Sequence, residues 1–423
     1  MWIDSHKEIT SGLEVEEYDP DLTDEYVYPV RCGVCRPGEV IVSEGQYVRA
    51  GQKIIEAGRG ISACVHASVS GKVVAVEPRS IIGEENVLCV VIKNDKKYTD
   101  YTEYNEHTDY DCGHIINIVK EAGVIGMGGA GFPAHIKYMV KEPEKIRYII
   151  ANAAECEPYV TSDHRMLKER MEEIEGGLKI LGRIFQNARL ILADGNTITE
   201  INGKNKMQGN RADRKKTDRN RTYRDRSGSS RSGSSRSDRC DYPHGAERQL
   251  VYAVTGYRLK AGELPFRAGC IVNNVHTLSA VYNAVFRGLP SIKRIVTVTG
   301  GGIGRPVNYL VRLGADIQDV IQSCGGLKND HVNVIAGGPM MGTALNTLHV
   351  PVMKTTSGIV CIDNSGSEKR MTECIRCGRC IQVCPCGLKP YRETGETECM
   401  GCGCCAYVCP AGRELTLSMH RKG

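Results

Sequence analysis

The sequence predicts a multidomain protein of mixed α/β and α+β class. Its 423 residues are too many for one compact core and suit three or four modules. Short strand-like runs fill the first hundred residues, and buried-strand runs alternate with helical patterns in the middle. Ten of the twenty cysteines fall between Cys374 and Cys409. We therefore expect an N-terminal arm at 1–23, followed by modules at 24–100, 110–290, 291–350 and 365–423.

Residues 24–100 predict a small all-β module. They contain two similar half-motifs of short alternating strands, "VIVSEGQYVRAGQKI" and "ACVHASVSGKVVAV", a pattern like the barrel-sandwich fold of lipoyl and biotinyl domains. No Met-Lys-Met turn is present, so we expect no lipoylated lysine. His66 is interpreted as a packing or hydrogen-bonding residue and not as a ligand. Cys32 and Cys35 form an isolated CxxC motif, which is interpreted as reduced and structural.

The middle module contains a glycine-rich loop, Gly126-x-Gly128-x-x-Gly131, in which Gly129 is a fourth glycine. The spacing matches a dinucleotide-binding fingerprint, but that fingerprint needs a strand before the loop. Residues 114–122 show helical spacing instead, so a turn between helices stays open as an alternative. Four glycines in six residues leave backbone N–H groups uncovered, which suits a phosphate or a flat ring.

Polar side chains follow two buried-strand runs of the same module. The first group is Asn152, Glu155 and Glu157, after a strand predicted at 146–151, and the second is Asn273, Asn274 and Thr277. Ligands of α/β sheets bind at the carboxyl ends of strands. Asparagine at a strand end is more often a turn former. Two such groups beside a bare glycine loop favour one shared binding site.

The segment 204–239 does not fit an α/β module. It holds thirteen Lys/Arg and four Asp, a charge of +9, so the rest of the chain sums to −4 and offers no broad nucleic-acid-binding face. With three apolar residues it cannot form a core and is expected to be disordered. An RNA-binding tether is one alternative. We favour an altered reading frame at 204–240, because a one-base shift turns Asp-Arg codons into Ile-Glu and Ser/Gly/Arg codons into Val.

Residues 291–350 predict a strand in "RIVTVTG", a helix in "RPVNYLVRLGADIQDVIQSCGG" and a strand in "VNVIAGG". No chemical role is expected for this stretch. The module is expected to serve packing and docking.

Two cysteine runs end the chain, and each has the spacing C-x2-C-x2-C-x3-C-P. This is the spacing of bacterial ferredoxins with two [4Fe–4S] clusters, in which the fourth cysteine of each run ligates the other cluster. One cluster is assigned to Cys374, Cys377, Cys380 and Cys409, and the other to Cys399, Cys402, Cys405 and Cys384. Zinc is the alternative metal, but zinc ribbons use two separated CxxC pairs. Cys386 and Cys404 are surplus.

The remaining sequence patterns indicate in which cell compartment the protein is expected. No run of about eighteen apolar residues exists, and the N-terminus lacks the layout of a signal peptide, so no transmembrane segment is expected. Cysteines clustered for metal binding indicate a reducing compartment.

Several motifs in one order carry a family resemblance: "GMGGAGFPAHIKY", "NAAECEPY", "YPHGAERQL", "VNNVHT", "GGPMMG" and the paired cysteine runs. Together they resemble RnfC, the peripheral subunit of membrane-bound ferredoxin:NAD⁺ oxidoreductases, from about residue 24 to 412. The glycine loop and "VNNV" also look like the flavin-binding subunit of respiratory complex I. The resemblance implies a complex-I-like flavin domain at 110–290, a β-grasp module at 291–350 and a dicluster ferredoxin domain at 365–423.

The same resemblance implies site roles. The loop glycines Gly126, Gly128, Gly129 and Gly131 would line FMN and NADH, and Lys137 would face the flavin phosphate. Asn152, Glu155 and Glu157 would surround the isoalloxazine and nicotinamide. Asn273, Asn274 and Thr277 would hold the FMN phosphate. No side chain is expected to act as a catalytic acid, base or nucleophile, because hydride transfer needs positioning.

The resemblance further implies an electron-transfer subunit that links NADH, FMN and two [4Fe–4S] clusters. Its expected partners are other subunits of a membrane electron-transport complex, with ferredoxin or a reductase as redox partner, at the cytoplasmic inner face of the membrane. Relatives that serve a soluble proline or cobalamin reductase are one alternative. A non-catalytic ferredoxin-like adaptor with a decayed flavin site is another.

Overall fold

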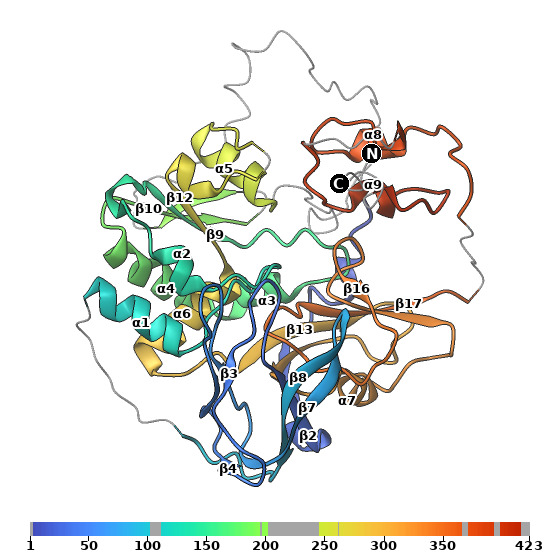
Figure 1. Ribbon diagram of the computed structural model, residues 1–423. Helices are drawn as coiled ribbons and strands as arrows, with labels where there is room; N and C mark the ends of the chain where they lie inside the picture. Colours follow the sequence, from blue (N-terminus) through green and yellow to red (C-terminus); the bar gives the residue numbers. More distant parts are fainter. Residues whose placement is uncertain are drawn as a thin grey trace.

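The computed structural model describes residues 3–101, 111–194, 197–201, 245–260, 262–365, 371–392 and 398–415. These residues form four β-sheets with their helices, and a small module that holds the cysteine runs (Figure 1). The predicted insertion at 204–240 lies outside the described residues. Within the described ranges, no helix is both long and apolar enough to cross a bilayer.

The N-terminal module consists of two small antiparallel sheets. Their strands are β2 (Glu25–Pro29), β3 (Glu39–Val40), β4 (Tyr47–Val48), β5 (Lys53–Glu56), β6 (Val65–His66), β7 (Gly71–Ile81) and β8 (Glu84–Asn94). The β7–β8 hairpin turns at Gly83, whose φ of 77° is a left-handed conformation that glycine adopts without strain. Alternate side chains of β2, Tyr26 and Tyr28, point inward and are buried, as the strand period requires.

The middle module is a four-stranded sheet in the order β11-β10-β9-β12 with helices on both faces. Strands β9 (Tyr148–Asn152), β10 (Arg189–Ala193) and β12 (Cys270–Asn274) are parallel, and β11 (Ile198–Ile201) is an antiparallel edge. Its helices are α1 (Cys112–Glu121), α2 (Ala134–Tyr138), α3 (Ser162–Glu169), α4 (Met171–Ile184), α5 (Glu247–Thr255) and α6 (Val275–Arg287).

The two faces of this sheet bury separate apolar clusters. Leu178 of α4 and Leu278 of α6 pack with Ile149 on one face, while Val251 of α5 packs with Ile150 on the other. Strands covered on both faces read as continuous apolar runs, which is why β9 was recognisable in the sequence. The predicted helix before the glycine loop is α1, and Gly123 follows it with a φ of 64°.

A six-stranded sheet in the order β1-β14-β13-β17-β15-β16 forms the third module. Its strands are β1 (Val15–Glu17), β13 (Lys293–Thr299), β14 (Val307–Arg312), β15 (Val332–Ala336), β16 (Thr343–Ala344) and β17 (Gly358–Asp363), with helix α7 (Ile317–Ser323). The sheet therefore draws strands from the predicted arm at 1–23 and from beyond residue 350. Its core is continuous with that of the N-terminal module, and the Ser68 hydroxyl donates to Leu313 O at 2.6 Å.

The cysteine module contains only short helices, α8 (Arg379–Val383) and α9 (Cys404–Tyr407), which lie close to each other (Figure 1). The chain also has single 3-10 turns at Lys7–Ile9, Pro20–Leu22, Pro143–Lys145, Pro265–Ala268 and Pro390–Arg392. A module with so few apolar side chains has only a small apolar core of its own.

Candidate functional site

A cleft of about 1060 Å³ opens between the glycine loop and the carboxyl ends of β9 and β12. Its volume lies at the upper end of the range for ligand pockets. Eight of the predicted residues line it: Gly126, Gly128, Gly129, Gly131, Lys137, Asn152, Asn274 and Thr277. The structure thus brings the glycine loop and part of both strand-end groups to one place.

The glycine loop is closed at its base by backbone and side-chain hydrogen bonds. Gly126 N–H donates to Phe132 O at 2.7 Å. The buried Thr277 hydroxyl accepts from Met127 N at 2.9 Å and donates to Ile125 O at 3.3 Å. Thr277 therefore acts on the loop, which fixes the path of the backbone along the cleft.

The N–H groups of residues 128–131 have no hydrogen-bond acceptor among the described residues. At Gly128 a side chain is excluded, because a Cβ would lie 2.9 Å from Asn274 Cβ. At Gly129 the space is open, since a Cβ there would meet no described atom within 4 Å. Unpaired backbone donors along a cleft without side chains in the way are the donor set that binds a phosphate. This stretch fits the phosphate and ring edge of a flavin nucleotide.

The N-terminal module supports the loop from behind. Val34 N donates to Ala130 O at 2.9 Å, and the Cys35 thiol donates to Gly131 O at 3.3 Å. Burial raises the pKa of the Cys35 thiol to about 11, so it stays protonated and able to donate. Of the isolated CxxC pair, only the Cys35 thiol reaches the loop, while the Cys32 thiol lies 3.6 Å from the Thr355 hydroxyl.

Lys137 is one of four basic residues that line the cleft, with Lys141, Lys145 and Arg267. Its ammonium donates to Val272 O at 2.8 Å, which leaves two of its three donors for a ligand. Burial lowers the pKa of Lys137, and the nearby Glu247 carboxylate acts in the opposite direction. A partly buried ammonium at the cleft wall suits an anionic group.

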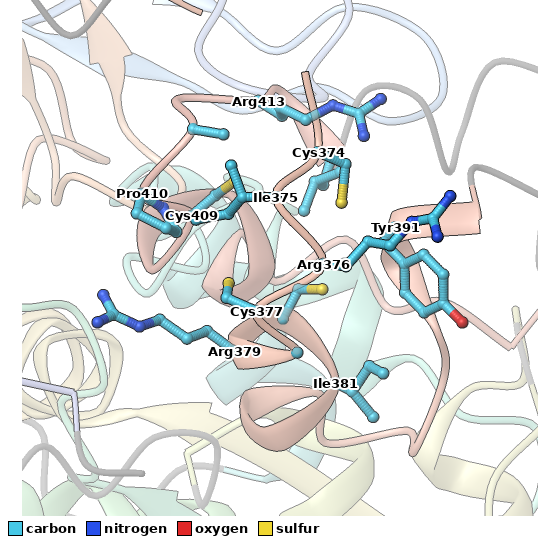
Figure 2. A pocket seen from close by; sticks show the side chains of 14 residues that line it. Cys374, Ile375, Arg376, Cys377, Arg379, Ile381, Tyr391, Cys409, Pro410 and Arg413 are labelled. Carbon is cyan, nitrogen blue, oxygen red and sulfur yellow. The ribbon is translucent and has the colours of Figure 1, made fainter. Parts of the chain in front are cut away.

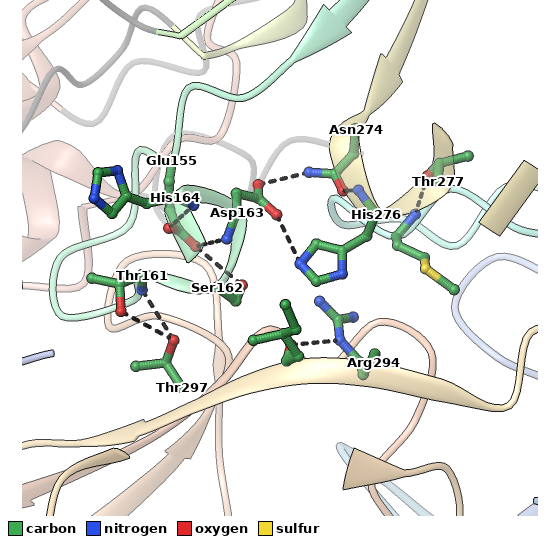
Figure 3. Close-up of polar contacts among 12 residues, drawn as sticks. Glu155, Thr161, Ser162, Asp163, His164, Asn274, His276, Thr277, Arg294 and Thr297 are labelled. Atoms are coloured by element: carbon green, nitrogen blue, oxygen red, sulfur yellow. Dashed lines mark hydrogen bonds and ion pairs between the residues drawn. The ribbon is translucent and has the colours of Figure 1, made fainter. Parts of the chain in front are cut away.

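Behind the cleft lies a buried polar network that positions Asn274 (Figure 3). The Asn274 amide donates to Asp163 Oδ2 at 2.7 Å, and its oxygen caps α6 by accepting from His276 N at 2.9 Å. Burial raises the pKa of Asp163 to about 7 and holds the pKa of His276 well below its usual value. Arg294 is fully buried beside this group. Both the amide nitrogen and the oxygen of Asn274 are therefore held by hydrogen bonds, which fixes this side chain beside Gly128.

Three predicted residues do not line the cleft. The Glu155 carboxylate accepts from the N–H groups of the first turn of α3. Glu157 is turned toward the third module, where Met340 N donates to its Oε2 at 3.0 Å. Asn273 is buried and accepts from the Tyr138 hydroxyl at 3.0 Å. In the structure these side chains make helix-capping and packing contacts.

The cleft also has an apolar rim that the sequence did not indicate. Met139, Leu264 and Phe266 line it and remain 65%, 59% and 47% exposed. An exposed aromatic ring at a cleft mouth can stack on a flat ligand. No pattern in the sequence could have revealed these residues, since they lie in loops or at helix ends without periodicity.

The eight cysteines of the two runs lie around two cavities, four to each. A cavity of about 180 Å³ is lined by Cys374, Cys377, Cys380 and Cys409 (Figure 2). A second, of about 20 Å³, is lined by Cys384, Cys399, Cys402 and Cys405, together with the surplus Cys386 and Cys404. None of these ten cysteines forms a disulfide. Each fourth cysteine lies with the other run, as the spacing predicts.

The donor sets of both cavities fit iron–sulfur clusters. Backbone amides reach the sulfurs, as when Leu388 N donates to Cys384 Sγ at 3.3 Å and Gly401 N to Cys399 Sγ at 3.5 Å. Amides directed at sulfur are a usual feature of cluster sites. Burial raises the pKa of Cys380 and Cys384, and a bound cation would reverse that effect because it deprotonates a coordinating thiol.

The second cavity adjoins the cleft module. Arg248 of α5 donates to Glu398 O at 3.4 Å and to Glu398 Oε2 at 3.0 Å, next to Cys399. Its neighbour Glu247 lines the cleft. On the other side, a Cβ on Gly403 would lie 2.3 Å from Met340 O, so the cysteine module also packs closely on the third sheet.

Three family models match the chain. They are the RnfC barrel sandwich hybrid domain at 2–97, the Nuo51 FMN-binding domain at 119–283 and the SLBB domain at 295–344. These matches confirm the predicted barrel-sandwich and complex-I-like domains. In the solved structures, the chain is similar to an NAD⁺-reducing [NiFe]-hydrogenase, at 20% identity and a TM-score of 0.45 over 67% of this chain and 52% of that one.

Several relatives are similar over most of the chain, and each is the C subunit of a redox complex. The one from the proton-translocating ferredoxin:NAD(+) oxidoreductase complex of Clostridium ljungdahlii is 33% identical, covering 92% of this chain and 81% of the relative. The one from the Na(+)-translocating complex of Acetobacterium woodii is 35% identical, covering 86% and 79%. The one from an ion-translocating oxidoreductase complex of Rhodobacter capsulatus is 33% identical, covering 92% and 72%. The chain belongs to the RnfC family.

Proposed function

We propose that this chain is an electron-transfer subunit that takes an electron pair from NADH at an FMN in the cleft and passes single electrons to two [4Fe–4S] clusters. The observation that carries the proposal is the contact of Arg248 with Glu398, because it joins the helix at the cleft to the residue before Cys399. The cleft residue Glu247 and the cavity residue Cys399 are thereby linked through their sequence neighbours, Arg248 and Glu398.

The residues of the cleft have distinct parts in this proposal. The free N–H groups of residues 128–131 and the ammonium of Lys137 bind the phosphate, and Thr277 and Asn274 hold the loop in position. Phe266 stacks on a flat ring. FMN, when bound, converts a hydride into single electrons, which neither protein side chains nor cubane clusters can do.

The cluster ligands follow the two cavities. Cys374, Cys377, Cys380 and Cys409 hold one cluster, and Cys399, Cys402, Cys405 and Cys384 hold the other. The named complexes of the relatives support a place among other subunits of an ion-translocating membrane complex. In this proposal the chain lies on the cytoplasmic face of the membrane and exchanges electrons with a ferredoxin or reductase partner.

The proposal is tested on anaerobically purified full-length protein. About eight iron atoms per chain are expected, since two cubanes require them. The Cys377→Ala variant should lose one cluster, and Cys386→Ala, a matched change of a neighbouring cysteine, should keep both. NADH oxidation with an artificial acceptor should require added FMN. Zinc in place of iron, or NADH oxidation undiminished without flavin, would contradict the proposal.

A further inference from the structure

The two cysteine runs form an internal repeat whose members differ in charge. Aligned on their cysteines, Arg376 of the first run matches Gly401 of the second, and Arg379 matches Cys404. The backbone is the same at these positions, because each run has two left-handed residues before a short helix. The two runs therefore have similar backbones, and the first carries arginines at two positions where the second does not.

Arg376 occupies a position that disfavours it. Its φ is 55°, while Gly401 has 68° at the matching place. A residue other than glycine in this conformation costs about 1–2 kcal/mol. Among the described residues, neither Arg376 nor Arg379 has a hydrogen-bond or ion-pair partner, so no polar side-chain contact offsets this cost. Backbone strain at a residue that gains no compensating polar contact indicates a functional role for that residue.

The two cavities differ in charge accordingly. The lining of the first includes Arg376, Arg379 and Arg413 and no acidic residue (Figure 2). The lining of the second contains no charged residue. A cubane with four thiolate ligands is anionic and gains one more negative charge when it accepts an electron. Positive side chains favour that reduced form by Coulomb attraction.

Amide–sulfur hydrogen bonds act in the same direction but do not separate the two cavities. Cys380 in the first cavity accepts from the backbone of Ile381 and Tyr391, and Cys384 in the second from Leu388 and Cys386. Since amides serve both sites, they do not distinguish them. The arginine near the second cavity, Arg248, is paired with Glu398, whereas Arg376 and Arg379 at the first cavity have no ion-pair partner among the described residues. The exposed Cys377 further opens the first cavity to water, which also favours the more charged state.

We propose that Arg376 and Arg379 raise the reduction potential of the cluster held by Cys374, Cys377, Cys380 and Cys409 above that of the second cluster. The inference rests on the proposed function, in which both cavities hold clusters. One electron then moves from the second cluster, which is oxidised, to the first, which is reduced. The cluster beside the cleft is a relay, and the arginine-lined cluster is the acceptor of the pair.

The test is a redox titration followed by electron paramagnetic resonance on the full-length protein loaded with iron, sulfide and FMN. The variants are Arg376→Gly, which installs the residue of the second run, Arg379→Gln, and both together. Arg376→Lys and Arg379→Lys retain the charge, and Lys179→Gln removes an equal charge from the solvent side of helix α4. Cys377→Ala and Cys402→Ala assign each couple to its cavity.

In the double variant we expect the higher potential to fall by at least 59 mV, a tenfold change in a one-electron equilibrium, with the other couple unmoved. The lysine variants and Lys179→Gln should match the unaltered protein. If the double variant loses iron, the single variants give the same comparison. The inference is overturned if the first cavity holds the couple of lower potential. It is also overturned if the potential of that couple is unchanged in the double variant, or if the potentials of both couples shift together. Fewer than two couples in the unaltered protein would instead contradict the proposed function.

Discussion

Replacing Glu157 by glutamine should stabilise the protein at neutral and alkaline pH. The Glu157 carboxylate is directed into the third module, where Met340 N donates to Oε2 at 3.0 Å. Its Oε1 is buried and has no hydrogen-bond partner in the described part of the chain. Burial is the largest cause that raises the pKa of this group to about 7, outweighing the amides of Met340 and Met341.

The sign and size of the effect follow from that pKa. Below about pH 4.5 the carboxyl is protonated in the folded and unfolded chain, so it contributes no pH dependence. Between pH 4.5 and 7 the unfolded chain releases the proton while the folded chain keeps it, so stability falls as pH rises. One pH unit corresponds to about 1.4 kcal/mol. The ionised Glu157 thus costs the folded state about 3 kcal/mol above pH 7.

Urea unfolding of Glu157→Gln and the unaltered protein, followed by circular dichroism at pH 5 and pH 8, measures this cost. The two proteins should differ little at pH 5, and the variant should be more stable at pH 8 by up to about 3 kcal/mol. Asp163, whose pKa burial also raises, contributes equally to both proteins and cancels in the difference. The opposite result would be a variant that is less stable than the unaltered protein at pH 8 but not at pH 5. It would show that Glu157 is ionised and paired in the folded chain, and would refute the reasoning.

Three further predictions concern the cleft, the third module and the atypical segment. Lys137→Ala should weaken FMN binding at least tenfold in fluorescence titrations, since a charged hydrogen bond is worth about 1.5–3 kcal/mol, while Lys179→Ala should not. Gly338→Ala should destabilise the chain by about 1–3 kcal/mol in thermal unfolding, because its Cβ would lie 2.2 Å from Glu157 Oε2, whereas Gly12→Ala meets no atom within 4 Å. The coding DNA for 204–239, read in the neighbouring frame, should be open and rich in Ile, Val, Leu and Glu. Stop codons there would favour a disordered insertion that can be deleted without loss of FMN binding.

The parts of the molecule that depend on local chain geometry were predictable from the sequence. Cysteine spacing determines which thiols can share a cavity, because a short loop closes on itself and its fourth cysteine turns away. The parallel strands β9 and β12 are covered on both faces, and their unbroken apolar runs are visible without a partner.

Features that depend on distant partners were not predictable. Strand β14 was included in a predicted helical stretch, because its burial comes from pairing with β13 and with β1 of the N-terminal arm. Glu157 follows a strand end as ligand-binding residues do, but its orientation is set by Met340, which is 183 residues away in sequence. The exposed rim residue Phe266 has no periodicity to reveal it.

The most direct test of the central claim is whether NADH reduces the clusters through FMN within this chain. Full-length protein with about eight iron atoms is mixed anaerobically with NADH, with and without bound FMN, and frozen for electron paramagnetic resonance. With FMN, we expect the signal of reduced clusters to appear, and without FMN we expect no signal on the same timescale. Clusters reduced equally fast without flavin, or a reduced flavin beside clusters that stay oxidised, would contradict the account.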